Sequence, residues 1–431
     1  MRPTRLLLPL IISLAVNAAQ AANLGEIYQL ALANDPVYAA AKETWRAGQE
    51  ALPQGKALWR PTINLSGNIR QNDTETSTPS SVNYRSSGYG LTLTQPLFRK
   101  PNLESYEQAK LAVLLADQQL GLAEQDLILR VAQAYFDVLL AEDTLSTVVA
   151  QKQAYAEQLA QAKKSFEVGA ATIVDTHEAQ ARYDLAISQE IAAQNDLEVK
   201  RRGLEKLIAR EAPALDRLGA AAGIPLPMPN EMDSWVRQAQ EQSLAVLASQ
   251  TALESAKREV ERQRGAHLPT LDLTASYTDS RKTNLGALDS KAGVIGLELG
   301  WVLYQGGAIS SRVREAVAKQ EKARYDLDNA RRQSTLDARQ AYLGVVSGDA
   351  QVKALEQALV SSESQLKSTK LGLDVGVRTR VDVLNAQQLV YSTQRDLASA
   401  RYQTLLAGLQ LKAAAGTLSA EDLKALDALL K

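Results

Sequence analysis

Long stretches of the chain carry apolar residues at steps of three and four, the spacing that keeps one side of a helix apolar. Between Pro101 and Pro213, where no proline occurs, this pattern runs from Leu103 to Val168 and again from Ile173 to Ile208. At about 1.5 Å per residue, the first limb alone spans on the order of 100 Å. The pattern therefore predicts a long helical hairpin that turns at Gly169, since glycine readily takes the left-handed conformation at a helix end.

Two pairs of segments alternate instead between apolar and polar residues, which is the period of a strand with two different faces. The first pair covers about 61–71 and 87–98, and the second pair covers about 269–279 and 292–304. Each segment has roughly the 9 to 11 residues that a tilted strand needs to cross a bilayer. Aromatic residues near the strand ends fit the interfacial girdles of membrane barrels: Trp59, Tyr89, Phe98, Tyr277, Trp301 and Tyr304.

The alternative to membrane strands is a pair of soluble hairpins packed on the helices. Isolated two-stranded hairpins are marginal in water, which favours the membrane sheet. In hydrocarbon, an open sheet edge leaves backbone groups without hydrogen bonds, so a membrane sheet must close into a barrel. Because the smallest known barrels have about eight strands, four strands per chain require two, three or four copies, giving about eight, twelve or sixteen strands.

Nearly the whole mature chain is a tandem duplication. The tip of the first hairpin returns in the second half with the same order and spacing, as Val168-Gly169-x-x-Thr172-x-x-Asp175 and Val375-Gly376-x-x-Thr379-x-x-Asp382. We therefore divide the mature chain into a first repeat (22–210), a proline-rich linker (211–233), a second repeat (234–416) and a C-terminal segment (417–431). The helices of the second repeat are expected at Ser234–Gly265, Ala308–Leu373 and Val381–Ala415.

The first 21 residues have the features of a secretory signal peptide. Arg2 and Arg5 precede an apolar run from Leu6 to Val16, and Ala19-Gln20-Ala21 forms a cleavage signal. An uncleaved anchor helix is the alternative, but the apolar run is short for the ~30 Å of hydrocarbon. No later stretch offers enough consecutive apolar residues for a membrane helix, so any entry into a membrane must use strands.

Composition excludes several classes of function. The formal net charge of -1 shows no excess of basic residues, so nucleic acid is not expected as a partner. The absence of cysteine excludes disulfides and thiolate metal sites. The two histidines, His177 and His267, lie in different halves and belong to no metal or catalytic motif. We therefore expect no catalytic residues, no metal site and no cofactor, and we do not expect an enzyme.

The doubled layout of strand pairs and long hairpins resembles the TolC family of outer-membrane channels. The similarity is densest at 265–276, at 375–384 and at Gly416-Thr417-Leu418, and it covers essentially Asn23 to Lys431. It implies a mainly helical protein with membrane strands, in which three copies form a twelve-stranded β-barrel in the outer membrane and an α-barrel of long hairpins in the periplasm. The copy number of three is thus what the resemblance selects from the possibilities above.

The resemblance also implies a function. Family members are passive exit ducts for type I protein secretion or multidrug efflux, opened when a periplasmic adaptor and an inner-membrane translocase of the ABC or RND type dock. The alternative is a periplasmic coiled-coil adaptor or structural protein. That alternative accounts for the long helices but leaves the four alternating strands unexplained.

The hairpin tips are the candidate docking site for an adaptor. A glycine with small neighbours lets another helical tip approach its backbone closely. This hypothesis assigns docking to Val168, Gly169, Thr172, Val375, Gly376 and Thr379.

The resemblance further implies a gate at the same end. Arg378 would pair with groups on the first hairpin, while Asp175 and Asp382 would line the constriction. Where the family pattern has a tyrosine and a second aspartate, this chain has Leu373 and Asn385, so that one hydrogen bond and one anionic ring differ. Arg380 replaces an apolar residue and would offset the negative charge of the mouth. The structural alternative is that both aspartates only stabilise the first turn of a helix.

Overall fold

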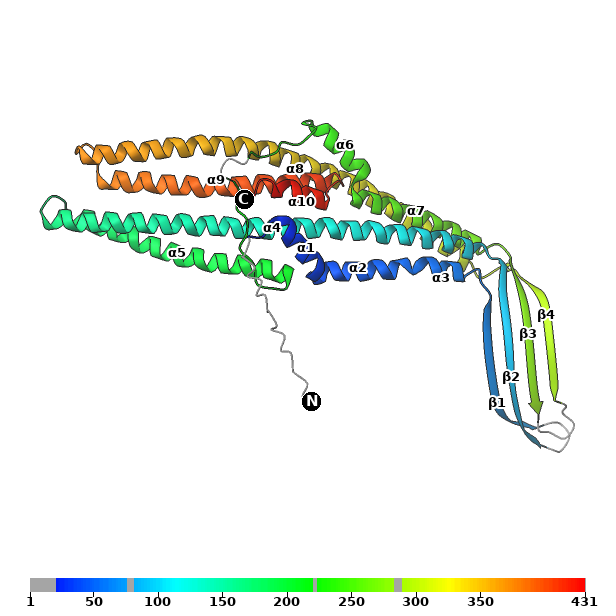
Figure 1. Ribbon diagram of the computed structural model, residues 1–431. Coiled ribbons are helices and arrows are strands. Elements are labelled where there is room, and N and C mark those ends of the chain that lie inside the picture. The colour runs from blue at the N-terminus through cyan, green and yellow to red at the C-terminus, as the bar shows by residue number, and fades with distance from the viewer. Residues whose placement is uncertain (1–20, 76–80, 220–222, 283–288, 431) are drawn as a thin grey trace, which may run out of the picture.

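The computed structural model describes residues 21–75, 81–219, 223–282 and 289–430. The molecule is a long rod of parallel and antiparallel helices, and a sheet bends away from one end of it (Figure 1). The predicted signal peptide, 1–21, lies outside the described residues except for Ala21. Among the helices of the described ranges, none is both long enough and apolar enough to cross a membrane.

Both predicted helical hairpins are confirmed. The first consists of α4 (Lys100–Glu167) and α5 (Ile173–Ile208), and the second of α8 (Ala308–Asp374) and α9 (Arg380–Ala414). The first helix takes Pro101 into its first turn, where no amide hydrogen is needed.

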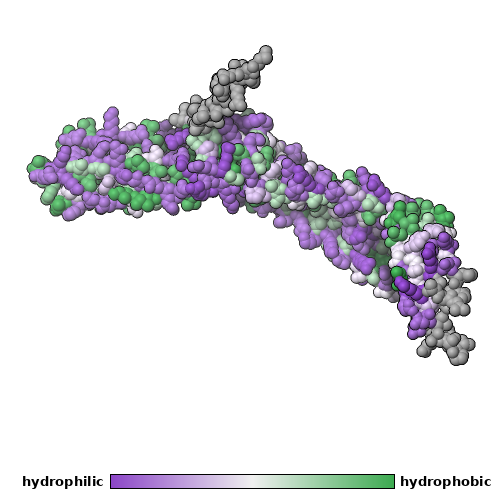
Figure 2. All heavy atoms as spheres, turned by 60° about the horizontal axis from the view of Figure 1, so that its bottom comes forward, coloured by the Kyte–Doolittle hydropathy of each residue, from purple (hydrophilic) through white to green (hydrophobic). Residues whose placement is uncertain are grey.

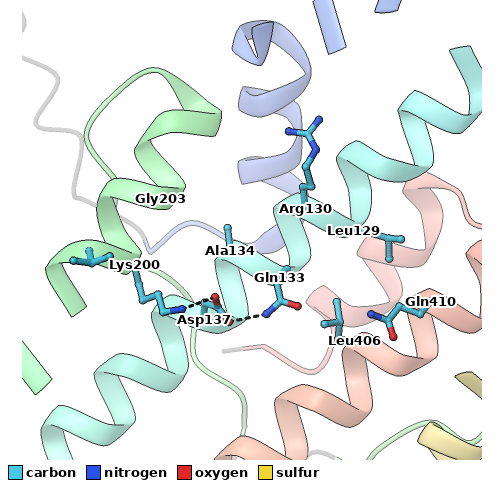
Figure 3. Close-up of a pocket in the computed structure, with 10 residues that line it drawn as sticks. Leu129, Arg130, Gln133, Ala134, Asp137, Lys200, Gly203, Leu406 and Gln410 are labelled. Carbon is cyan, nitrogen blue, oxygen red and sulfur yellow. Dashed lines mark hydrogen bonds and ion pairs between the residues drawn. The ribbon is translucent and has the colours of Figure 1, made fainter. Parts of the chain in front are cut away.

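The two limbs of the first hairpin are tied by polar contacts as well as by apolar packing. On α4, the carboxylate of Asp137 accepts hydrogen bonds from Gln133 (2.7 Å) and from Lys200 of α5 (2.9 Å). These residues line an open hollow that α9 borders through Leu406 and Gln410 (Figure 3). Leu129, Ala134 and Leu406 of its lining also pack against buried apolar residues.

The strands form one antiparallel sheet in the order β1-β2-β3-β4. Their bounds are Thr62–Glu75 (β1), Ser81–Phe98 (β2), Thr270–Lys282 (β3) and Ser290–Gly300 (β4). Pairing continues into segments expected as loops, because main-chain hydrogen bonds do not require apolar side chains. At the other end β4 stops at Gly300 and not at residue 304, since its partner begins at Thr270. The next residue, Trp301, instead donates its indole N–H to the carbonyl of His267 (3.0 Å).

The register gives the sheet one apolar and one polar face. Ile63, Leu93, Ala275 and Ile295 lie opposite one another on the four strands. Isoleucine and leucine side chains on this face are largely exposed, and a hydrophobic patch marks the end of the molecule that carries the sheet (Figure 2). The residues between them are mainly Ser, Thr, Asn and Gly. Such a two-faced sheet matches a wall between lipid and water.

Shorter helices run from the sheet to the middle of the rod. In the first repeat these are α1 (Leu24–Asn34), α2 (Pro36–Gln49) and α3 (Ala51–Ala57). The chain breaks between α1 and α2 at Asp35, whose buried carboxylate both caps α2 and pairs with Arg130 of α4 (2.9 Å).

The second repeat differs from its prediction. Residues 232–265 form two helices, α6 (Met232–Gln242) and α7 (Leu244–Gly265), and not the single helix expected from Ser234. Gly416, at φ +75°, packs against this break so closely that a Cβ there would stand 2.2 Å from the carbonyl oxygen of Gln242, which only glycine permits.

The main core lies at the middle of the rod and collects both ends of the chain. Buried side chains from α1, α4, α5, α9, the linker and α10 (Ala420–Asp427) form one cluster around Tyr135. The linker is part of this core, since Leu215 is buried and pairs with Ala22 in a β-bridge. The carboxylate of Asp427 accepts the amide hydrogen of Gly25 (3.2 Å), which joins α10 to α1.

We predict that the two equivalent tyrosines of the repeats differ in their contribution to stability. Tyr135 is fully buried and donates its hydroxyl hydrogen to the carbonyl of Asp216 (2.8 Å), whereas Tyr342 is partly exposed and bonds the side chain of Asn230 (2.9 Å). Tyr135→Phe should cost about 1–3 kcal/mol because it leaves the partly buried carbonyl of Asp216 without its hydroxyl donor. The matched change Tyr342→Phe should cost less than about 0.5 kcal/mol. Denaturation followed by circular dichroism of the helices measures the free energy of unfolding of both variants. Equal losses of stability would contradict the prediction that Tyr135 contributes more than Tyr342.

Candidate functional site at the hairpin tips

Each hairpin turns through the same hydrogen-bonded motif at its tip. Gly169 has φ +72°, and its amide donates to Phe166 (3.0 Å) while the amide of Ala170 donates to Ser165 (2.8 Å). At the second tip, Gly376 has φ +79° and the amide of Val377 donates to Gly372 (2.9 Å). This is a Schellman motif, which ends a helix by satisfying its last carbonyls. The predicted left-handed glycine is therefore confirmed at both tips.

The threonine and aspartate of each tip form a capping box. The hydroxyl of Thr172 accepts the amide hydrogen of Asp175 (3.3 Å), and the carboxylate of Asp175 accepts the amide hydrogen of Thr172 (2.9 Å). Thr379 and Asp382 repeat this arrangement at 3.2 and 2.9 Å. Two backbone donors are thus satisfied at the start of each return helix. Both aspartates have this structural role, whatever they do in an assembled mouth.

The same hydrogen bonds shift the acidity of both carboxyls. The pKa of Asp175 is lowered by its hydrogen bonds with the side chain and backbone of Thr172, with a smaller effect from the charge of Arg380. The pKa of Asp382 is lowered by the backbone and side chain of Thr379, and less by the charge of Arg378. Both groups are therefore anionic at neutral pH.

The two hairpins of one protomer are joined near the tips by arginines. Arg380 donates from Nη2 to the hydroxyl of Ser165 on the first hairpin (2.7 Å). One turn further from the tip, Arg182 of the first hairpin donates to Asn385 (3.1 Å) and to Gln388 (2.7 Å) on the second. Arg380 also lines a cleft of about 280 Å³, whose other polar residues are Glu157, Gln158, Gln161, Asp175, Lys370, Asp374 and Gln387.

Arg378 lies differently from the position expected of a residue that pairs with the first hairpin. Within the described part of this single chain, the guanidinium of Arg378 makes no hydrogen bond or ion pair, while its backbone amide donates to the carbonyl of Gly372 (3.1 Å) and its stem packs against the same residue. Arg380 is the arginine that reaches Ser165 and the neighbourhood of Asp175. Leu373 lines the cleft, and Asn385 is held by Arg182. The structure thus brings Arg380, Asp175 and Asn385 to the border between the hairpins, with Arg378 on the tip itself.

Sequence reasoning missed Ser165 and Arg182 as partners. A hairpin pattern specifies which residues share a helix face but does not specify how two hairpins lie against each other. The one available signal was Arg380 itself, since a charged residue at an otherwise apolar position needs a polar partner.

Comparison with known proteins identifies the family. The sequence profile described as "Outer membrane efflux protein" matches residues 27–210 and 235–417. The chain belongs to this family. It is 34% identical to outer membrane protein TolC of Vibrio cholerae over 99% of this chain and 98% of that protein. It is 30% identical to the "Proteases secretion protein PrtF" of Dickeya chrysanthemi over 99% of this chain and 95% of that protein.

Solved structures show the same fold. The outer membrane protein VceC of Vibrio cholerae superimposes with a TM-score of 0.78 at 18% identity, covering 91% of this chain and 96% of VceC. The protein is therefore an outer-membrane efflux and type I secretion channel with a periplasmic extension, and its family is a family of non-enzymatic transporters whose channels are trimeric. This excludes the alternative of a periplasmic adaptor.

The lowered pKa values predict how tip stability depends on pH. A carboxyl whose pKa is lower in the folded state contributes stability above its ordinary pKa of 3.8, and this contribution is lost as the pH falls through the lowered value. Amide protection factors in the first turns of α5 and α9 should stay constant between about pH 7 and about pH 5 and fall below 3.8. Hydrogen exchange measures them, with Asp175→Asn and Asp382→Asn as controls that should remove this dependence. A decline in the protection factors that persists in both variants would show that other groups cause it.

Proposed function

We propose that three copies of this chain form one continuous passive duct through the outer membrane and across the periplasm. The observation that carries this proposal is the open four-stranded sheet with one lipid-type face. Its edge strands β1 and β4 have unpaired backbone groups on their outer sides, and lipid offers these groups no hydrogen bonds. Pairing β1 of one copy with β4 of the next satisfies both edges in a closed ring.

The helical rod supports the same assembly. Exposed apolar side chains follow the outer helices of the layer, which are α5 and α8. They are Val174, Leu185, Ile191 and Val199 on α5, and Val317, Leu336, Leu343 and Val360 on α8. A rod in water is expected to cover such stripes. Neighbouring protomers in a ring would bring α5 of one copy against α8 of the next.

We infer that a periplasmic adaptor docks at the tips and connects the duct to an inner-membrane translocase of the ABC or RND type. Three exposed valines, Val168, Val375 and Val377, surround the tip glycines and have exposed fractions of 78%, 66% and 75%. A Cβ on either glycine would meet nothing within 4 Å, so the tip surface is open. The similarity to PrtF supports secreted proteins as one cargo class, beside small molecules.

We infer that the gate has two sets of contacts. Within a protomer, Arg380 and Arg182 hold the second hairpin to the first. Between protomers, Arg378 is placed on the tip where it can meet Asp175 of the next copy, while Asp382 lines the mouth. Each exposed polar contact contributes about 0–1 kcal/mol, so three copies of one contact supply at most about 3 kcal/mol. Such a gate would yield to a docked adaptor.

We predict that Arg380→Ala raises the single-channel conductance of the protein in a planar bilayer, because it releases Ser165 without removing a helix cap. The combination Arg380→Ala with Arg182→Ala should raise it further. Arg378→Glu should also raise conductance, and high salt should reduce the difference from the unaltered channel. Arg332→Ala is the matched control, since Arg332 is an exposed arginine of α8 that pairs within its own helix. Unchanged conductance in all three arginine variants would refute the gate.

We predict that charge on the tip valines blocks docking. Val168→Glu combined with Val375→Glu should abolish export and adaptor crosslinking, because it places an uncompensated charge in an apolar contact. These positions have φ of -92° and -94°, so the substitutions leave the backbone unstrained, whereas leucine at either glycine would strain the turn. Trimer assembly, measured by heat-dependent migration in gels, should persist. Normal export from an intact double variant would remove the tips as the docking site.

A further inference from the structure

One group of charged residues borders the apolar face of the sheet at the end away from the helices. The register pairs Tyr89 with Asp279 and Asp279 with Lys291, so all three side chains share the face that carries the exposed leucines and isoleucines. Arg281 follows on the same face, two residues further along β3. On β3 the ring of Tyr277 lies between Asp279 and the aliphatic residues, 6.5 Å from the ring of Tyr89, which stands opposite Asp279 on β2. The order along β3 is therefore aliphatic, aromatic, charged.

A single buried carboxylate organises this group. Asp279 is 2% exposed and accepts a hydrogen bond from the hydroxyl of Tyr89 (3.2 Å). Its two oxygens lie 3.6 Å from Nε of Arg281 and 3.8 Å from Nζ of Lys291. Both distances exceed that of a hydrogen bond, and both cationic side chains are 67% exposed. Two cations thus share one anion, and their hydrogen-bond donors remain available to a ligand.

The height of the group matches the outer boundary of the membrane. Leu271 begins the apolar face on β3 and Asp279 ends it, a separation of roughly 26 Å at about 3.3 Å per residue. A strand tilt of about 40° reduces this to about 20 Å across the bilayer, close to the apolar band of an outer-membrane barrel. Because the other end of the sheet continues into the periplasmic helices, the charged group faces the headgroups of the outer leaflet.

We propose that Arg281 and Lys291 form a binding site for the phosphate of an anionic lipid headgroup in the outer leaflet. The guanidinium can bind two phosphate oxygens side by side, and the ammonium adds a point charge. Beside them a hollow, lined in part by Gly67, Ser87 and Tyr89, leaves room for a headgroup. A lipid phosphate is favoured over a free one because the site is continuous with the apolar face, where acyl chains pack.

The function of the site is to fix the sheet at one depth and to favour anionic lipid around the barrel. The buried carboxylate of Asp279 attracts both cationic side chains and so keeps them on the lipid side of the sheet. Arg70 offers a matched contrast. It is an exposed arginine of β1 at a similar height, but its position in the alternation places it on the polar face.

The test is binding of lipid A to the full-length channel purified in detergent, counted by native mass spectrometry, with phosphatidylethanolamine as the zwitterionic comparison. Each cation near an anionic surface contributes about a fivefold change in affinity. Arg281→Gln with Lys291→Gln should therefore weaken lipid A binding about 25-fold, while phosphatidylethanolamine binding stays unchanged. The conservative variant Arg281→Lys, which leaves Lys291 unaltered, should retain most of the affinity for lipid A. Gel migration of the heat-modifiable assembly verifies that each variant is folded.

Arg70→Gln is the matched control and should leave lipid A binding unchanged. Equal affinity of the double variant and the unaltered channel would overturn the proposal. Loss of affinity in Arg70→Gln as large as in the double variant would also overturn it, because the effect would then follow from total charge. A third arm adds inorganic phosphate, and displacement of lipid A at equal concentration would show a site for free phosphate and refute the lipid assignment.

Discussion

The requirement that every backbone hydrogen bond in a membrane be satisfied controls this molecule. The sheet ends at β1 and β4 with unpaired edges, and a single chain has too few strands to close on itself. This constraint also affects the helices, because α4 follows β2 directly. Arg99, which lies between β2 and α4, donates from Nε to Oδ1 of Asp272 on β3 (2.8 Å). This contact fixes the direction in which the long helices leave the sheet. Ring closure of the strands therefore dictates how the helices of neighbouring copies meet.

Much of the fold could be predicted because its elements follow regular periods. The three-and-four spacing identified α4, α5, α8 and α9, and strict alternation identified the strands and their apolar face. The predictions failed where the cause was a neighbour and not a period. The break at Ser243 lies where Gly416 of a distant segment packs against the chain, and the extent of the strands follows from backbone pairing beyond the last apolar residue.

The residues of the candidate site also fall into those that could be predicted from the sequence and those that could not. Gly169 and Thr172 were predictable because a Schellman motif and a capping box are local, and both can be read within eight residues or so. The contact between Arg380 and Ser165 was not predictable, since it depends on how two hairpins far apart in sequence lie together. The duplication also suggested that the two tips make the same contacts, which is wrong. Thr172 and Thr379 occupy the same local structure, yet the next residue is Ile173 at the first tip and Arg380, which bonds Ser165 of the other hairpin, at the second.

The central core closes where α10 returns to α1, and this contact orders the assembly of the core in time. Gly25 of α1 is held by Asp427 of α10. The linker lies between them, against Ala22 on one side and Leu430 on the other. During synthesis from the N-terminus, α1 can pack on α4 and α5 before α10 exists, so its contact with α10 is the last of these to form. The central core therefore closes only when α10 reaches it, across helices from both repeats.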